Sequence, residues 1–255
     1  MRINTNVGAL TASRNAFVNN MAMDSSMRKL ASGLRISRAA DDAAGLAIAN
    51  KLRTQSRALS QAAANAEQGN AMLQIAEGAA QIIGRIIERQ KELIVQKNNG
   101  TSSTATIATM DAEIASLSTE ATRIQNSSNL QGTAVFGSIV YQVSDATANG
   151  TLTINASLTQ SALTGSSTLA DADAALDVVN AVLGNIGAGQ NVLDYTVPNL
   201  KSAVVNVRAA ESTIRDVDMA EEMATYTRSN ILTQAAQAML SQANQGSQGI
   251  LQLLR

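Results

Sequence analysis

The longest regular pattern in the chain is a helical one, and it runs over residues 41–96. This stretch holds no proline and few glycines, and its apolar positions recur in alternating steps of three and four residues, as in a coiled-coil stripe. The stripe comprises Ile75, Ala79, Ile82, Ile86, Gln90 and Leu93. It predicts one long helix of roughly 55 residues and about 80 Å, longer than the width of about 50 Å expected for a compact globule of this size, so we expect a rod.

Two more stripes with the same steps follow this helix. The Asn-Asn-Gly run at residues 98–100 is a helix stop signal, after which the second stripe can fold back antiparallel to the first. That second stripe comprises Ile107, Met110, Ile114, Leu117, Ala121 and Ile124. The third stripe runs from Leu176 to Ile214 and keeps its phase through Pro198, which predicts one helix kinked at that proline. A helix break at Pro198 is the alternative.

Residues 131–168 change character and become rich in Gly, Ser, Thr and Asn. Residues 139–143 and 151–154 alternate in a strand-like way, and Asn149-Gly150 before the second run is a turn signal. We expect a small β-hairpin here, with a disordered loop as the alternative.

The two ends, residues 1–40 and 216–255, carry looser stripes rich in Ala and Met, along with many Asn and Gln. Such helices bury little apolar area per turn, and isolated helices are marginal in water. We therefore expect each terminal helix to need a partner, and the nearest candidate is the other terminal helix. The predicted fold is mainly α, an elongated antiparallel helical bundle or coiled-coil rod with a small β-hairpin region.

The composition argues against several kinds of function. The chain of 255 residues has no His, Cys or Trp, and 19 Lys and Arg residues balance 20 Asp and Glu residues. Metal sites usually draw on Cys or His, and acid–base catalysis at neutral pH most often uses His, so we expect no enzyme, no metal and no cofactor. Nucleic-acid binding needs a basic excess, which is lacking. The chain shows neither the apolar run of a membrane span nor that of a cleaved signal peptide, so we expect no membrane insertion.

Residues 30–52 combine a helix break with closely spaced charges. Gly33 permits the chain to leave a first helix, and Asp41 or Asp42 can cap the next one. Arg35 and Arg38 lie close enough in sequence to pair with these acids. A capped helix start with solvated charges explains the same spacing.

The same stretch and the opening MRINTNVGAL resemble the N-terminal signature of bacterial flagellins. The run TIRDVDMAEEMATYTRSNILTQAAQAMLSQANQGSQGILQLLR, residues 213–255, is similar to the flagellin C-terminus along its whole length. The resemblance covers about residues 1–130 and 170–255. It implies a structural subunit that polymerises into the helical bacterial flagellar filament, which is secreted, extracellular and serves motility.

The resemblance also implies how the chain divides. Residues 1–40 and 216–255 would be the N- and C-terminal inner-core helices around a channel. Residues 41–130 and 169–215 would be the two parts of the helical rod in the next layer, and residues 131–168 the short hairpin and loop region where longer flagellins insert outer domains. The residues expected to drive polymerisation are Ile231, Leu232, Met239, Ile250, Leu251, Leu253 and Leu254.

A second site is implied at residues 89–96, which look like the flagellin patch sensed by an animal Toll-like receptor. Arg89, Leu93 and Glu113 fall at the positions that carry recognition in receptor-activating relatives. Arg89 offers a planar fork of donors and Glu113 an acceptor beside the apolar Leu93. The alternative is that Leu93 belongs to the helical seam and both charges are solvated.

The partners implied by the resemblance are copies of the chain itself, the flagellar export apparatus, an export chaperone, and hook-associated and cap proteins. A rival function is that of the hook–filament junction protein, which shares the terminal helices. A rival of another class is an amphipathic helix protein of the membrane surface. That class should carry Lys and Arg beside an apolar face together with bulky aromatics, and the aromatic content of 2% argues against it.

Overall fold

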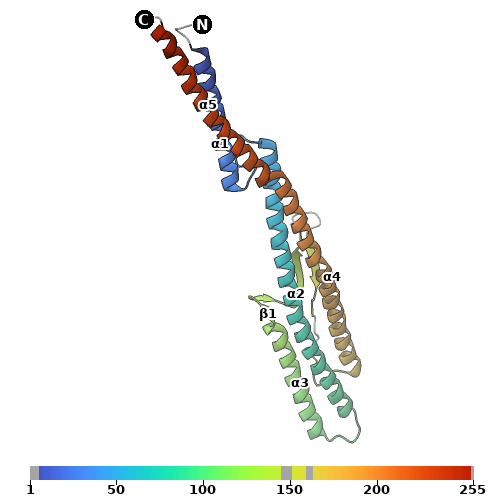
Figure 1. Cartoon of the computed structure of the whole chain (residues 1–255). Helices are drawn as coiled ribbons and strands as arrows, with labels where there is room; N and C mark the ends of the chain where they lie inside the picture. The colour runs from blue at the N-terminus through green and yellow to red at the C-terminus, as the bar shows by residue number, and fades with distance from the viewer. Residues whose placement is uncertain (1–5, 145–150, 159–162, 254–255) are drawn as a thin grey trace. The chain divides into compact units, whose positions relative to one another are not determined.

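The computed structural model describes residues 6–144, 151–158 and 163–253. The chain falls into two compact units, residues 1–54 with 207–255 and residues 55–206. As predicted, it is mainly helical, with long antiparallel helices and small two-stranded sheets (Figure 1). The helices are α1 (Val7–Ser32), α2 (Ala43–Lys97), α3 (Thr104–Ser127), α4 (Leu169–Arg215) and α5 (Met219–Leu253), and the strands are β1 (Asn129–Leu130), β2 (Thr133–Ala134), β3 (Ser138–Gln142) and β4 (Thr151–Asn155).

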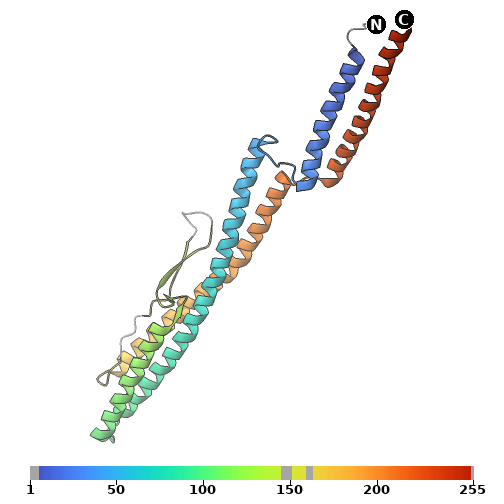
Figure 2. The same cartoon turned by 90° about the vertical axis from the view of Figure 1, so that its left-hand side faces the viewer.

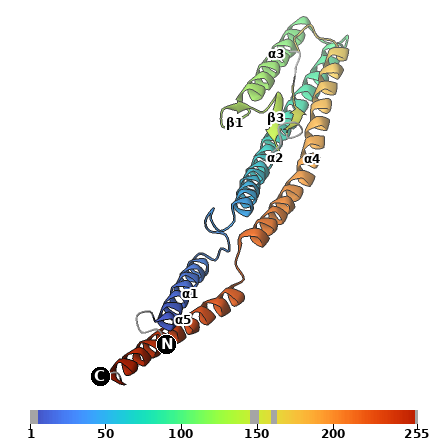
Figure 3. The same ribbon diagram turned by 90° about the horizontal axis from the view of Figure 1, so that it is seen from above.

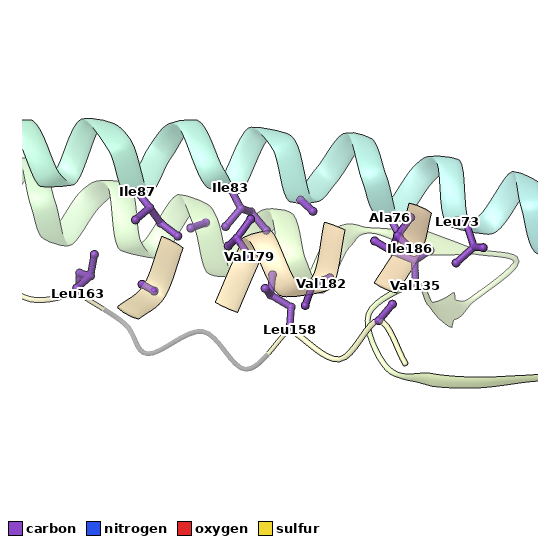
Figure 4. Packing of buried hydrophobic residues seen from close by; sticks show 14 of the residues in the cluster. Leu73, Ala76, Ile83, Ile87, Val135, Leu158, Leu163, Val179, Val182 and Ile186 are labelled. Carbon is purple, nitrogen blue, oxygen red and sulfur yellow. The ribbon is translucent and has the colours of Figure 1, made fainter. Parts of the chain in front are cut away.

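In the unit of residues 55–206, α3 and α4 both lie antiparallel to α2 (Figure 2). One apolar cluster joins the three helices, and Figure 4 shows Ile83 of α2 close to Val179 of α4 within it. The segment after β4 completes this core, because Leu158 and Leu163 are buried in the same cluster. Polar contacts reinforce the edges: Lys91 of α2 lies 2.5 Å from a carboxylate oxygen of Asp173 in α4.

The long helices begin and end close to where the sequence predicts. The second stripe is the buried face of α3, where Met110, Ile114 and Ala121 have little exposed surface. The first stripe is confirmed in part: Ala79, Gln90 and Leu93 are buried, but Ile75 and Ile82 remain 39% and 41% exposed. Because α3 and α4 both cover α2, its buried face is broader than one seam and includes Leu73, Ala76, Ala80, Ile83 and Ile87. α4 continues through Pro198, so the alternative of a break there is wrong.

The predicted hairpin is present, so the alternative of a disordered loop is wrong. β3 and β4 pair antiparallel from Ser138↔Asn155 to Gln142↔Thr151, and the predicted turn residues Asn149 and Gly150 lie outside the described residues. A second hairpin of β1 and β2 was not predicted. Its turn places Gln131 at φ 52° and Gly132 at φ 82°, the positive values that a tight two-residue hairpin turn requires.

The start of α2 is capped by an aspartate, as predicted. Asp42 Oδ1 accepts a hydrogen bond of 2.9 Å from the Gly45 backbone nitrogen. Asp41 Oδ2 accepts from the backbone nitrogens of Arg38 and Ser37 at 2.9 and 3.1 Å, and these donors lower the pKa of Asp41. The ion pair considered between Arg35 and Asp41 or Asp42 is wrong, because the guanidinium Nη2 of Arg35 donates to the Ile214 carbonyl, 2.7 Å away.

In the other unit, α1 and α5 form an antiparallel pair (Figure 3), which confirms the expectation that the terminal helices partner each other. Asn6 caps α1 by accepting from the Ala9 backbone nitrogen through its side-chain oxygen. Asp218 caps α5 in the same way, accepting from the backbone nitrogens of Ala220 and Glu221.

Candidate assembly surface

The contact between α1 and α5 is built from small side chains. Among the side chains that the structure describes, the fully buried ones of the pair are Ala12, Ser26, Ser229, Thr233 and Ala236, none larger than threonine. Thr233 carries its hydroxyl oxygen there without a hydrogen-bond partner. Small side chains let two helices approach closely, but they remove little apolar area from water. The fully buried part of this contact is therefore made of small residues, whereas larger apolar groups such as Met23, Leu30 and Leu240 are only partly buried.

Many of the larger apolar groups of the pair lie in solvent. Phe17 of α1 is 66% exposed, and Leu10 is 68% exposed. The remaining exposed large apolar side chains of the two helices are Val7, Val18, Met21, Met27, Met219, Met223, Ile231, Leu232 and Met239. Scattered exposed apolar residues are normal, but a surface this rich in them on one helix pair marks an interaction site.

Both helices contribute to a hollow in this surface. From α1 it is lined by Val7, Thr11 and Asn15, and from α5 by Leu232 and Met239, with a mainly apolar lining overall. A neighbouring apolar hollow on α5 is lined by Met223 and Ile231 among others. The hollows can accept large apolar side chains from another protein surface, which is how a partner would remove these groups from water.

Three of the residues predicted to drive polymerisation lie on this surface. Ile231, Leu232 and Met239 are 60%, 46% and 63% exposed. The side chains of Ile250, Leu251 and Leu253, in the last turn of α5, lie outside what the structure describes, and so does the whole of Leu254. The apolar face of α1, with Leu10 and Phe17, was not predicted, although the period of its apolar residues could have revealed it.

The residues of the implied receptor patch are brought together in the unit of residues 55–206. The guanidinium of Arg89 donates to Glu113 Oε1 through Nε at 3.3 Å and Nη2 at 3.2 Å, and to Glu92 through Nη1 at 3.0 Å. The hydrogen bonds that Arg89 donates to Glu92 and then to Glu113 raise the pKa of Arg89. Both Arg89 and Glu113 have about half of their side chains exposed.

Leu93 is placed differently from the two charges. It is only 2% exposed and belongs to the apolar cluster of α2, α3 and α4. The surface therefore presents the Arg89–Glu113 pair, while Leu93 lies in the core. This matches the seam alternative for Leu93, and the two charges are half-exposed and paired with each other.

The part of the chain that the structure describes holds no group of three or more His, Cys, Asp or Glu residues arranged to bind a metal ion. Among the same residues, no helix has the length and hydropathy to cross a membrane. The features that call for explanation are thus the exposed apolar surface of α1 and α5 and the long helices.

A helix pair that buries small residues and exposes many large apolar ones is typical of a protein that associates with further chains. Comparison with known proteins identifies which one. Residues 3–140 match the bacterial flagellin N-terminal helical region, and residues 169–254 match the C-terminal helical region. The chain belongs to the bacterial flagellin family; it is a subunit of the flagellar filament and not an enzyme.

Relatives of similar length support this assignment end to end. The chain is 41% identical to a flagellin of Halalkalibacterium halodurans and 38% identical to a flagellin of Bacillus subtilis, with all of each chain covered. It is 37% identical to the flagellar filament 33 kDa core protein of Treponema phagedenis, again with both chains fully covered. These matches favour the filament subunit over the junction protein that shares its terminal helices.

Proposed function

We propose that the chain polymerises into a helical filament through the apolar surface of α1 and α5, and that rotation of this filament provides motility. The observation that carries the proposal is the exposure of large apolar side chains such as Phe17, Ile231 and Met239 on a pair already packed through small residues. Burial of each such side chain contributes about 1.5–3 kcal/mol. An open helical polymer supplies the burial, because one surface meets a different surface of the next copy.

In this proposal the terminal helices of residues 1–40 and 216–255 form the inner layer of the filament around a channel. Residues 41–130 and 169–215 form the next layer, and residues 131–168 lie toward the outside. The short length of this last region, which contains the small β3–β4 hairpin, supports a filament with a smooth surface.

The proposed location is outside the cell, and the proposed route is the flagellar export apparatus. An export chaperone would cover the exposed apolar side chains of α1 and α5 before assembly. The cap and hook-associated proteins would meet the same surface at the two ends of the filament. The exposed apolar side chains support these contacts, since they need cover at every stage before polymerisation.

We also propose that the Arg89–Glu113 pair is recognised by an animal Toll-like receptor. Arg89 supplies a planar set of donors that a carboxylate of the receptor can take over, and the charge pair is accessible in the single chain. Leu93 takes part by holding the helix surface beneath the pair in place.

Polymerisation of the purified full-length chain tests the main proposal. We expect Ile231→Asn and Met239→Asn to abolish filaments in sedimentation and electron microscopy, because both place an amide where apolar contact is needed. Deleting residues 250–255 should do the same, since it removes Ile250, Leu251, Leu253 and Leu254 from every subunit.

Val140→Asn is the matched control. Val140 of β3 is 58% exposed, like Ile231, but it lies in the hairpin region proposed to face outward. We expect this variant to form normal filaments. Normal polymerisation of both α5 variants would contradict the proposed role of this surface.

A further inference from the structure

The small side chains between α1 and α5 leave the register of the pair weakly defined. The fully buried residues described in this contact, such as Ala12, Ser26 and Thr233, are alike in size, so none of them fits into only one hole on the partner helix. A shift of one helix by one turn, about 5.4 Å, would exchange one of these small residues for another. These residues therefore leave room for a contact elsewhere to set the register.

The register matters because both helices line the same hollow. Val7 and Thr11 of α1 face it together with Leu232 and Met239 of α5. Sliding one helix past the other would separate these groups and destroy the shape of the surface. A defined assembly surface thus requires a defined register.

A clasp between the two linkers supplies this constraint. The linker after α1 and the segment between α4 and α5 form a short antiparallel bridge at Leu34 and Asp216. The Arg35 backbone nitrogen donates to the Arg215 carbonyl at 2.7 Å, and the Val217 backbone nitrogen donates to the Gly33 carbonyl at 3.1 Å. The bridge aligns the end of α1 with the start of α5.

The guanidinium of Arg35 closes the clasp. Its Nη2 donates to the carbonyl of Ile214, 2.7 Å away, in the last turn of α4. The last carbonyls of a helix lack partners within the helix, and a cation is favourable at that end of the helix dipole. Arg35 therefore binds the end of α4 through both its backbone and its side chain.

Neighbouring residues fit this arrangement. Gly33 ends α1 with φ 69°, a left-handed conformation that glycine adopts without strain, and this turns the linker toward α4. Lys29 of α1 lies 3.6 Å from Glu222 of α5, next to the clasp. At the opposite end of the pair, Asn6 Nδ2 donates to the Ala243 carbonyl at 2.9 Å. Polar contacts thus mark both ends of the pair.

We propose that Arg35 is a positioning residue for assembly, because it sets the register of α1 against α5 through the clasp. The inference rests on the proposed function, since the register acts through the surface that meets other copies. Arg35 itself need not touch a neighbouring subunit.

Disulfide trapping can report the register because the chain contains no cysteine. A Cβ atom at Gly8 would lie 3.9 Å from the Cβ of Ala243, which is within the range of about 3.5–4.5 Å found in disulfides. Filaments of the Gly8→Cys/Ala243→Cys chain should therefore oxidise to an intrachain disulfide, which a non-reducing denaturing gel separates from interchain products. The same oxidation is then carried out with Arg35→Met added.

We expect Arg35→Met to lower the yield of the intrachain disulfide. In the chain without cysteines, the same substitution should raise the critical concentration for polymerisation about tenfold, as loss of a charge-assisted hydrogen bond predicts. Arg35→Lys should recover part of both effects, because lysine keeps a cation with fewer donors. Arg38→Met, a change of an exposed arginine in the same linker, should leave both unchanged.

The outcomes separate the inference from the function on which it rests. If the unchanged chain does not polymerise, the proposed function fails. If it polymerises and Arg35→Met leaves the critical concentration and the disulfide yield unaltered, the positioning role of Arg35 is overturned while the filament assignment stands.

Discussion

A Cβ atom at Gly189 of α4 would lie 2.7 Å from Cδ1 and 3.0 Å from Cγ2 of Ile154 in β4. Ile154 is only 5% exposed, so its side chain is pressed against the bare backbone of the helix. The absence of a side chain at Gly189 therefore creates the place on α4 where the hairpin of β3 and β4 is seated.

Gly189→Ala should lower the thermal stability of the chain. Alanine favours a helix by about 1 kcal/mol over glycine, but forcing a methyl group against the buried Ile154 costs about 1–3 kcal/mol. Gly184→Ala is the control on the same helix, because a Cβ there meets no atom within 4 Å, and it should raise the melting temperature. Circular dichroism melts of both variants test this. A higher melting temperature of Gly189→Ala would show instead that the β3–β4 hairpin shifts away from the added methyl group at little cost.

Arg89→Ala and Glu113→Ala should weaken receptor signalling by the single chain. Losing a hydrogen-bonded charge at a contact that becomes buried costs about 2–5 kcal/mol, roughly 30-fold or more in affinity. The fold should be unaffected, because exposed ion pairs contribute at most about 1 kcal/mol to stability. Signalling is measured in receptor-expressing cells, with a melt of each variant alongside. Unchanged signalling from both variants would remove the receptor proposal and leave the filament assignment untouched.

Leu93→Ala should weaken receptor signalling by destabilising the fold and not by removing a contact with the receptor. Its side chain is buried in the core, so truncation should destabilise the unit of residues 55–206 by about 2–5 kcal/mol. Any loss of signalling should then be accompanied by a lower melting temperature, unlike the loss caused by Arg89→Ala. Leu93→Met, which roughly keeps the volume, should recover much of the stability and the signal together. A signal lost in Leu93→Ala at full stability would instead indicate direct contact with the receptor.

The carboxyl of Asp171 should titrate below its ordinary pKa of 3.8, because the Thr168 backbone nitrogen and then the Thr168 hydroxyl donate to it. A carboxyl with a lowered folded-state pKa contributes stability above its unfolded pKa, and this is lost as the pH falls through the folded value. The first turn of α4 should thus be insensitive to pH near neutrality and loosen only in acid. Carbon-13 NMR of the carboxyl gives the midpoint. Thr168→Val should move it only part of the way back to 3.8, since the backbone donor remains.

Limited proteolysis of the single chain should trim residues within 1–40 and 216–255 and spare a core that begins near Asp41. The contact between α1 and α5 removes little apolar area from water, so their ordering should depend on assembly. Trypsin sites such as Arg14 and Arg228 should be cut in the single chain and protected in the filament. Mass spectrometry of the fragments identifies the cleaved sites. Equal protection of these sites in the single chain and in the filament would contradict the proposal that assembly orders the terminal helices.

The positions of the long helices could be predicted because their stripes are long and end in clear stop signals such as residues 98–100. The buried face of α2 could be predicted only in part. A single stripe describes contact with one partner helix, whereas α3 and α4 both cover this helix, which buries Ile83 and leaves Ile82 exposed. The β1–β2 hairpin escaped prediction because its turn places Gln131 at positive φ, where Asn or Asp would be the usual signal.

Of the candidate sites too, one could be predicted from the sequence and one could not. The paired charges of Arg89 and Glu113 lie 24 positions apart on adjacent antiparallel helices, and the family resemblance was enough to bring them together. Arg35 and Ile214 are 179 positions apart, and their contact depends on where two linkers meet in three dimensions. No periodicity or motif in either linker carries that information.

The burial of Leu158 and Leu163 decides where this chain can accept extra sequence. An insertion between Gln142 and Thr151 would leave all five pairs of the β3–β4 ladder in place, and lengthening a connection is inexpensive, about 0.6 kcal/mol for each doubling. An insertion beside Leu158 or Leu163 would pull a buried leucine out of the core of α2, α3 and α4. A peptide tag or a grafted epitope therefore belongs at the tip of this hairpin and not in the segment that follows it.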